Sequence, residues 1–416
     1  MRIKVLLAIA FAVLLSGCVD TPDAEGWKPS QKDEFLKILE TDKYASICNQ
    51  QALYKKVKQS ENSKLMSKLL VSYTQNLANG CIDLQSFKAS QDAKKERKIE
   101  THYETYLQDA KASSIMMKLR AGQSIEQILK PYVPEYDQFF DLMRRYTLLK
   151  GDHNTSASTL RKLRLNIERV KLMKSGFGEN YALVNIPEYV VRIIEKKKTA
   201  VAMAVVVGKR RMQTPIFSAD LQYVTLNPQW GVPDSIARNE VIPKMLKDPG
   251  YLARKNMVIR KSYDLNSAAI SKDSIDWEAY LIEEKGKKEM TYKFIEVPSK
   301  RNGLGRVKFI FPNKHSVYMH DTQSKSLFKR KVRTYSHGCV RLEKPVAMLR
   351  HISENYTSQS PEQVKGWYDS LKTHHMGLDK RLPVHTSYLT TYVDECGNLL
   401  VFNDIYGFDK SQKLNF

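Results

Sequence analysis

The hexapeptide "SHGCVR", which runs from Ser336 to Arg341, gathers several residue types that do chemistry in one short stretch. His337 lies two residues before Cys339, and a second histidine, His320, lies nineteen residues before it. A separation of nineteen residues suits a strand, a long loop and a return onto a neighbouring strand. Residues two apart on an extended segment share one face. We therefore expect His337, Cys339 and Arg341 to lie together, with His320 beside them.

A cysteine next to an imidazole is a candidate nucleophile. A free thiol has a pKa of about 8.5 and is only slightly ionised at neutral pH, so a histidine that takes its proton activates it. Gly338 lets the backbone approach a reacting carbonyl closely, and the N–H groups of Gly338 and Cys339 suit an oxyanion. The planar fork of Arg341 suits a carboxylate. The pattern predicts acyl transfer through a thioester, on a substrate that carries a carboxylate.

Three other roles for the cysteine stay open on these residues alone. Cys339 as a structural residue of a strand is the generic alternative. His320, His337 and Cys339 provide the three ligands of a catalytic zinc site, for which Asp321 would have to act as the base. A disulfide with Cys396 would silence the thiol. Otherwise Cys396 is incidental, in a predicted hairpin turn at Cys396-Gly397-Asn398.

Length and charge limit the class of protein. The chain has 416 residues, of which 42% are hydrophobic, enough for about two or three domains with a sizeable core. The formal net charge is +22. Twelve Lys or Arg residues lie between Lys300 and Lys344, against only Asp321 and Glu343. This basic block is either a solvated face or a funnel for an acidic substrate, and its position around Cys339 favours the funnel.

The N-terminus carries the pattern of an export signal. Arg2 and Lys4 precede an apolar run of eleven residues, "VLLAIAFAVLL", which is too short to span a membrane. The run ends in "LSGC", which resembles a bacterial lipobox. We expect a lipoprotein signal peptide at 1–17, lipidation of Cys18 and a tether at 18–30; an ordinary signal peptide is the alternative. For an extracytoplasmic chain we expect no nucleic acid partner, and an oxidising compartment permits disulfides.

The elements that must position these residues change in type along the chain. Residues 31 to about 173 have helical spacing, for example in "SKLMSKLLVSYTQNLANG", and "KKERKIETHYETYLQDAKASSIMMKLRAG" continues it. Cys48 and Cys81 lie in this half and either pair or stay as free thiols. From about residue 180, β-branched runs on either side of "EKKK" predict strands. "DLQYVTLNPQW" and "VKFIFPNKHSVYMHD" are further strand candidates, helices follow at Pro345 and Pro361, and a hairpin closes the chain.

The two histidine segments, "MHDT" and "SHGCVRL", resemble the signature of L,D-transpeptidases with a YkuD-type catalytic domain. A longer stretch, about 155–410, is similar to the large Gram-negative, YcbB-like branch of that family. The resemblance implies an α+β fold, with an α-helical N-terminal scaffold domain at 31–175 and a mainly β catalytic domain at 176–410. A substrate-capping insertion is expected at about 236–300. The peptidoglycan-binding module common in this branch is missing, because Tyr146 and Asn166 are only twenty positions apart.

The same resemblance implies the site and the reaction. Cys339 would attack the third residue of a donor tetrapeptide stem and release the terminal D-amino acid. His320 would be the base, oriented by the carbonyl of Asp321, and His337 and Gly338 would support the oxyanion. The residues expected to bind substrate are Asn227, Trp230, Tyr318, Asp321, Ser336 and Arg341.

An amine from a second stem would then form a 3→3 cross-link, with no cofactor and no metal. The alternatives are an L,D-carboxypeptidase, attachment of a protein to the wall, or a catalytically silent peptidoglycan-binding lipoprotein. We expect a periplasmic protein anchored to a membrane by its lipid and sensitive to carbapenems. Its helical domain is a candidate surface for wall-synthesis proteins.

Overall fold

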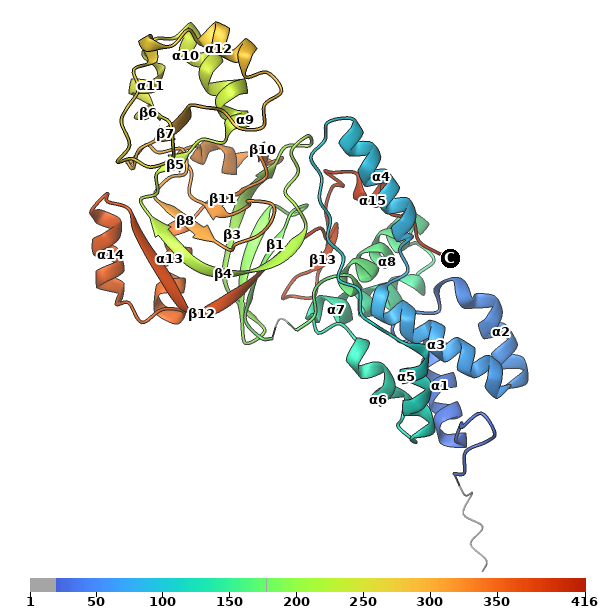
Figure 1. Cartoon of the computed structure of the whole chain (residues 1–416). Helices are drawn as coiled ribbons and strands as arrows, with labels where there is room; N and C mark the ends of the chain where they lie inside the picture. The colour runs from blue at the N-terminus through green and yellow to red at the C-terminus, as the bar shows by residue number, and fades with distance from the viewer. Residues whose placement is uncertain (1–19, 177) are drawn as a thin grey trace, which may run out of the picture. The chain divides into compact units, whose positions relative to one another are not determined.

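The structure is a computed structural model that describes residues 20–176 and 178–416, so the expected signal peptide at 1–17 and Cys18 lie outside the described residues (Figure 1). The described residues form two compact units. The first comprises 20–81, 107–133 and 415–416. The second comprises 82–106 and 134–414. Among the residues that the structure describes, no helix is long and apolar enough to cross a membrane.

The first unit is helical. Its α3 begins after Asn62, whose side chain accepts a hydrogen bond from the Leu65 N–H at 3.1 Å, and it ends at Gly80. A disulfide joins Cys48 and Cys81, with their Cα atoms 6.1 Å apart, so these two cysteines are paired. The helices of this unit are α1 (Pro29–Thr41), α2 (Gln51–Ser60), α3 (Ser63–Asn79), α5 (Ala112–Arg120) and α6 (Ile125–Leu129).

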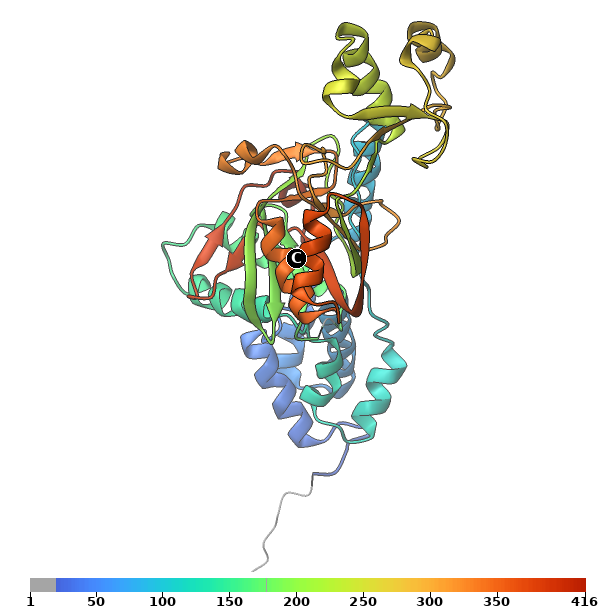
Figure 2. The ribbon, with the colours of Figure 1, turned by 90° about the vertical axis from the view of Figure 1, so that its left-hand side faces the viewer.

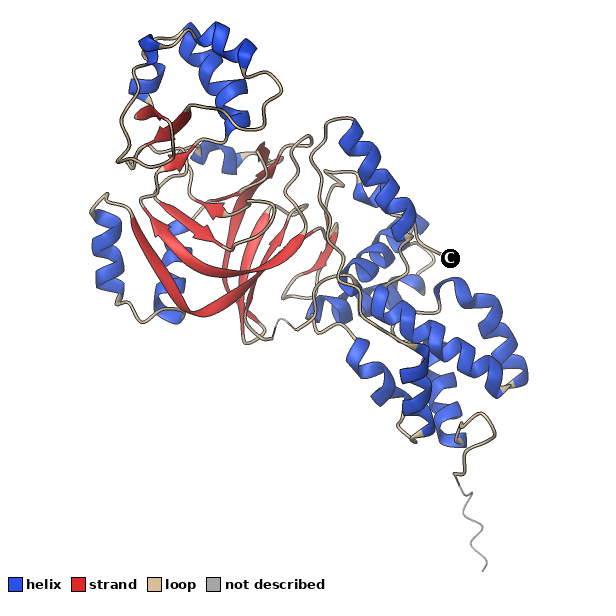
Figure 3. Ribbon diagram, viewed as in Figure 1, coloured by secondary structure: helices blue, strands red, loops and turns tan. Residues whose placement is uncertain are grey.

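The second unit is built around a nine-stranded sheet with the order β10-β3-β11-β9-β8-β4-β12-β1-β2 (Figure 3). β2 also pairs with β3, so the sheet closes on itself. Its strands are β1 (Tyr181–Asn185), β2 (Val190–Glu195), β3 (Lys198–Gly208), β4 (Phe217–Leu226), β8 (Val307–Ile310), β9 (Met319–His320), β10 (Thr334–Ser336), β11 (Val340–Leu342) and β12 (His374–Ser387). A separate hairpin comprises β13 (Thr391–Val393) and β14 (Leu399–Val401).

Alternating apolar residues of the strands form the main core of this unit. Val205 and Val207 of β3 are fully buried, and Val340 and Leu342 of β11 lie in the same apolar cluster. α13 (Pro345–Asn355) and α14 (Pro361–Asp369) pack onto this cluster, as Figure 2 shows. The short adjacent strands β11 and β9 lie between the long β3 and the four-residue β8. The expected α+β fold, with a helical N-terminal region before a sheet-rich domain, is confirmed.

The helices of the second unit that lie outside the stretch between β4 and β8 include α4 (Leu84–Glu96), α7 (Asp137–Lys150), α8 (Ala157–Lys171) and α15 (Phe408–Ser411). The compact units therefore do not divide at residue 175, where the sequence predicts a domain boundary, and that boundary stays a prediction. The predicted continuous helix through "KKERKIETHYETYLQD" is wrong, because α4 ends at Glu96. Beyond it, Glu100 and Tyr103 form bridges with the segment before β4, where cross-strand backbone hydrogen bonds replace helical ones.

Residues 232–297, called the insertion below, have a hydrophobic core of their own. Trp277, Tyr280 and Phe294 are buried in it. The insertion and the strand that enters it contain β5 (Trp230–Gly231), α9 (Asp234–Ile236), a π-helical turn (Ala237–Val241), α10 (Ile242–Lys247), α11 (Tyr251–Arg254), β6 (Met257–Arg260), α12 (Trp277–Glu283) and β7 (Lys293–Glu296). The expectation of an independent structure in this stretch is met by these elements; its capping role stays a prediction.

Candidate active site

Cys339 lies in the tight turn between β10 and β11. Gly338, directly before it, has a φ of +115°, which a side chain at this position would strain. The Ser336 hydroxyl closes the turn: it accepts the Gly338 N–H at 3.2 Å and donates to the Cys339 carbonyl at 2.5 Å. The Gly338 N–H is therefore occupied within the turn. The Cys339 N–H donates no hydrogen bond within the described chain, so it remains available as an oxyanion donor.

Strand pairing places His320 next to this turn. β9 and β11 are parallel neighbours, with Val340 opposite Met319 and Arg341 opposite His320. Because residues opposite each other share a face, and residues two apart share it as well, Cys339 and His320 lie on one face of adjacent strands. The sequence predicted this juxtaposition. In the described residues no hydrogen bond joins the two side chains; Cys339 Sγ lies 4.0 Å from the Ser316 carbonyl.

His320 is buried and neutral. Burial lowers its pKa to about 3, and the positive charge of Arg341 acts in the same direction. Its Nδ1 lies 2.5 Å from the Asp321 carbonyl, so this nitrogen carries the proton and Nε2 is left as the basic atom. The Asp321 side chain points elsewhere: it accepts the N–H groups of Arg306 and Thr322 and pairs with Lys325 at 2.7 Å. Only its carbonyl meets the imidazole.

The Cys339 thiol is also neutral at rest. Burial raises its pKa, and hydrogen bonding to Tyr318 and the positive charges of Lys308 and Arg341 oppose that rise. The Tyr318 ring contacts the His320 ring edge-on, with centroids 5.6 Å apart. A neutral thiol near a neutral imidazole suits general-base attack, in which the proton leaves as the bond forms. A preformed thiolate–imidazolium pair is disfavoured.

His337 connects the turn to the insertion. Its Nε2 lies 2.7 Å from Glu240 Oε1, in the π-helical turn, and 3.3 Å from Lys209 Nζ at the end of β3. Burial lowers the pKa of His337, and the charge of Lys209 adds to this. A carboxylate only accepts hydrogen bonds, so the neutral ring carries its proton on Nε2. π-helical turns are rare and occur often at functional sites.

Two further predicted substrate-binding residues, like the Asp321 carboxylate, are used inside the fold. The Asn227 amide donates to the carbonyls of Trp367, Tyr368 and Lys372, at 2.9, 3.1 and 3.1 Å. Its oxygen accepts a hydrogen bond from Arg306, so Asn227 fastens the end of α14 to β4. Trp230 packs against the apolar core of the insertion. The structure brings Tyr318, Ser336 and Arg341 to the Cys339 turn and leaves these two outside its immediate contacts.

The donor atoms for the zinc alternative do not converge. His320, His337 and Cys339 do not form a metal-binding group in the part of the chain that the structure describes. His320 Nδ1 and His337 Nε2 already have partners. A disulfide between Cys339 and Cys396 is excluded by position, since both are free cysteines and Cys396 is exposed in the β13–β14 hairpin.

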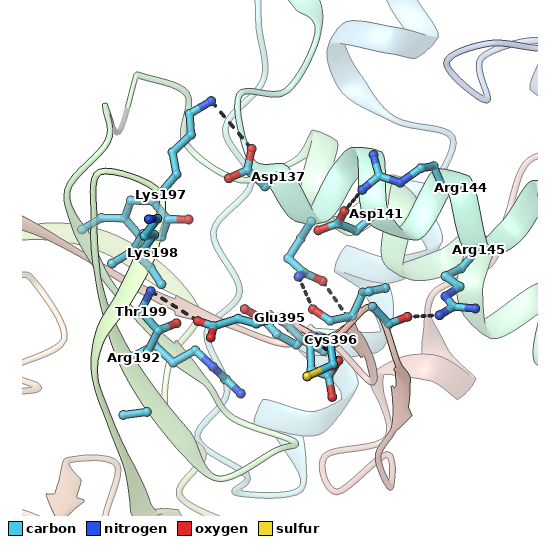
Figure 4. Close-up of a pocket in the computed structure, with 18 of the residues that line it drawn as sticks. Asp137, Asp141, Arg144, Arg145, Arg192, Lys197, Lys198, Thr199, Glu395 and Cys396 are labelled. Atoms are coloured by element: carbon cyan, nitrogen blue, oxygen red, sulfur yellow. Dashed lines mark hydrogen bonds and ion pairs between the residues drawn. The ribbon is translucent and has the colours of Figure 1, made fainter.

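A cavity of about 1110 Å³ lies elsewhere, between α7, the β2–β3 hairpin and the β13–β14 hairpin (Figure 4). Cys396 lines it, but Cys339, His320 and Arg341 do not. Its charged residues largely pair with one another or with near neighbours, as Asp141 does with Arg144. Such mutual pairing leaves little charge to attract a ligand, so we assign it no role in the chemistry.

Three residues near the site were not predicted to act there. Glu240 lies ninety-seven positions from His337 in sequence, and only folding brings the insertion to the turn. Thr214, in the segment between β3 and β4, donates to the Gly338 carbonyl at 2.8 Å. Lys308 lies opposite His320 in the β8–β9 pairing. The alternation of apolar and polar residues in "VKFIF" indicates that Lys308 faces away from the core. This alternation was the sequence feature that could have pointed to Lys308 as a site residue.

Comparisons with known proteins agree with this geometry. Residues 179–364 match the model of the YkuD family, described as the L,D-transpeptidase catalytic domain. A Haemophilus influenzae protein named "Putative L,D-transpeptidase" is 30% identical over 255 residues, which cover 61% of this chain and 49% of that protein. The chain therefore spans about half the length of this relative. The predicted Gram-negative branch stays a prediction.

Among solved structures, an L,D-transpeptidase from Mycobacterium smegmatis shares 12% identity and a TM-score of 0.22, over 50% of this chain and 58% of that one. An Enterococcus faecium L,D-transpeptidase shares 9% identity and a TM-score of 0.22, over 71% and 99%. TM-scores this low support no argument. The similarity to L,D-transpeptidases therefore rests on the family match, which spans the strands on either side of Cys339. Residues 179–364, which include the strands on either side of Cys339, are therefore similar to the L,D-transpeptidase catalytic domain of the YkuD family.

Proposed function

We propose that this protein is a peptidoglycan L,D-transpeptidase that forms 3→3 cross-links through a thioester on Cys339. The observation that carries the proposal is the placement of Cys339, on the Gly338 turn, beside the parallel strand that ends in His320. The family match supports the reaction class.

In the first half-reaction, Cys339 Sγ attacks the carbonyl of the third residue of a donor tetrapeptide. Its proton passes to Nε2 of His320, across a contact that tightens when substrate is bound. The Cys339 N–H stabilises the oxyanion. The intermediate collapses to a thioester as His320 returns the proton to the amine of the departing D-amino acid.

In the second half-reaction, the amine of another stem attacks the thioester. His320 takes a proton from that amine and the thiol is regenerated, so no cofactor is consumed. Arg341 binds a carboxylate of the stem. The exposed Lys329, Arg330 and Lys331 add to a positive field that attracts wall carboxylates. We further propose that the chain is periplasmic and is held to a membrane by a lipid on Cys18, because its N-terminal sequence resembles a lipoprotein signal.

Product analysis tests the proposal. Purified protein is incubated with disaccharide-tetrapeptide, and the products are resolved by mass spectrometry. The proposal predicts tetrapeptide–tripeptide dimers that are absent with Cys339→Ala. Tripeptide monomers alone would instead identify a carboxypeptidase, and a folded protein that yields neither product would leave only wall binding.

A further inference from the structure

Two positive charges flank His320 across the sheet. Lys308 of β8 lies opposite His320, and Arg341 of β11 lies opposite it on the other side. Residues opposite each other on neighbouring strands project from the same face. Lys308 and Arg341 therefore share the face that presents His320, Tyr318 and Cys339.

Lys308 is directed at the nucleophile. Its Nζ lies 3.8 Å from the centre of the Tyr318 ring, and the Tyr318 side chain in turn interacts with Cys339. A cation above an aromatic face is attracted to it, which fixes the direction of this flexible side chain. The ammonium group thus lies over the ring that contacts the thiol, and Cys339 is in its electrostatic surroundings.

Neither cation has a carboxylate partner in the described chain. Two half-buried cations elsewhere in this unit do: Lys293 pairs with Asp234 at 2.7 Å, and Arg192 pairs with Glu188. Two others, Lys94 and Arg333, donate to backbone carbonyls instead. Arg341 has Glu240 in its electrostatic surroundings, although its Nε lacks a hydrogen-bond partner. Among the described residues, Cys339 is the one charged or ionisable group found in the electrostatic surroundings of Lys308, and burial lowers the pKa of Lys308. An unpaired half-buried ammonium is costly unless an anion completes the site.

We propose that Lys308 is a second carboxylate-binding position of the donor site, separate from Arg341. Its ligand is a carboxylate carried by the peptide whose carbonyl Cys339 attacks. The identity of that peptide rests on the proposed function, but the capture of a carboxylate beside Cys339 does not. The site then selects acyl donors that carry a negative charge next to the bond being broken.

Alkylation of Cys339 by a matched pair of reagents tests this in the full-length protein. Iodoacetate is anionic and iodoacetamide is neutral, and both transfer the same kind of group to a thiolate. The rate ratio of the two reagents at Cys339 is measured by peptide mass spectrometry. The exposed thiol of Cys396 in the same digest provides the reference ratio. The alkylation test requires no transpeptidation. It therefore still decides this proposal if the protein is found not to form cross-links.

The proposal predicts that Cys339 prefers iodoacetate relative to Cys396. Lys308→Met should reduce that preference by about fivefold or more, because a charge-assisted contact in a half-buried site is lost. Lys308→Arg should retain it. Lys365→Met, at an exposed lysine of α14, is the matched control and should leave it unchanged. An unchanged ratio in Lys308→Met overturns the proposal. Equal slowing of both reagents also overturns it, since Lys308 would then act on the thiol alone.

Discussion

His337 Nε2 lies 2.7 Å from Glu240 Oε1, so a carboxylate of the insertion contacts the Cys339 turn. The contact is only partly shielded, with 24% and 37% of the two side chains exposed. It therefore contributes little to overall stability, but it restrains both the ring beside the nucleophile and the π-helical turn. We therefore expect this contact to link motion of the insertion to order at the active site.

Glu240→Gln tests that link. The amide is a weaker acceptor than the carboxylate, so we expect faster hydrogen–deuterium exchange in the Cys339 turn and in the π-helical turn. Global stability should change by less than about 1 kcal/mol, as is usual for partly exposed pairs. Glu278→Gln, in α12 of the same insertion, is the control. Equal exchange in both variants would mean that the contact restrains nothing.

The charge state of the site predicts an unusual pH dependence. Burial raises the pKa of the Cys339 thiol and lowers the pKa of His320 to about 3, so both groups are neutral near pH 7. The rate of iodoacetamide alkylation at Cys339 should therefore keep rising with pH beyond about 8.5, the value of an ordinary thiol. A rate that is already maximal near pH 6 would indicate a thiolate–imidazolium pair and would refute this assignment.

Gly338 and Gly366 should respond oppositely to alanine. Gly338 has a φ of +115°, so Gly338→Ala should lower the free energy of unfolding by about 1–3 kcal/mol. Gly366 is helical, in α14, with open space around its Cα, so Gly366→Ala should be neutral or raise it by about 0.5–1 kcal/mol. Urea unfolding measures both. Two variants of equal stability would show that the turn tolerates a side chain.

Asn227 should matter for stability rather than for chemistry. Its amide donates to three carbonyls at the end of α14, and its φ of +46° suits asparagine better than most residues. Asn227→Ala should lower the free energy of unfolding by about 2–4 kcal/mol, because buried carbonyls lose their donors. The alkylation rate of Cys339 in the folded protein should stay within about twofold of the parent rate. An Asn227→Ala variant with unchanged stability but an altered alkylation rate at Cys339 would instead support a role for Asn227 in the substrate pocket.

The local part of the site could be predicted from the sequence, because strand alternation and adjacency are local properties. An extended segment is enough to bring His337, Cys339 and Arg341 together. One return of the chain onto a neighbouring strand is enough to place His320 beside them. The Glu240 contact could not be predicted, because it depends on how an independently packed insertion meets a turn ninety-seven residues away. The role of Asn227 was hidden for a similar reason, since its partners lie 140 or more positions further along the chain.

Two segments of the fold could not be predicted, because their local composition is typical of a different structure. The polar run "HHMGLDKRLP" forms most of β12, although its charges, Gly377 and Pro383 suggest a loop. It pairs with β4 along one edge, with an irregular register between Gly377 and Leu382. Residues 100–104 lie between helical segments, but bridges and backbone hydrogen bonds to the segment before β4 hold them extended. In both places distant partners override local propensity.

The central claim is that Cys339 forms a thioester with a donor stem, and intact-protein mass spectrometry tests it most directly. Protein is mixed with disaccharide-tetrapeptide and quenched in acid at short times, and Cys339→Ala and Cys396→Ala are treated in the same way. The account predicts an adduct with the mass of the donor minus its terminal residue, located on Cys339, present in Cys396→Ala and absent in Cys339→Ala. Folded parent protein that forms no such adduct, or forms it in Cys339→Ala, would contradict the account.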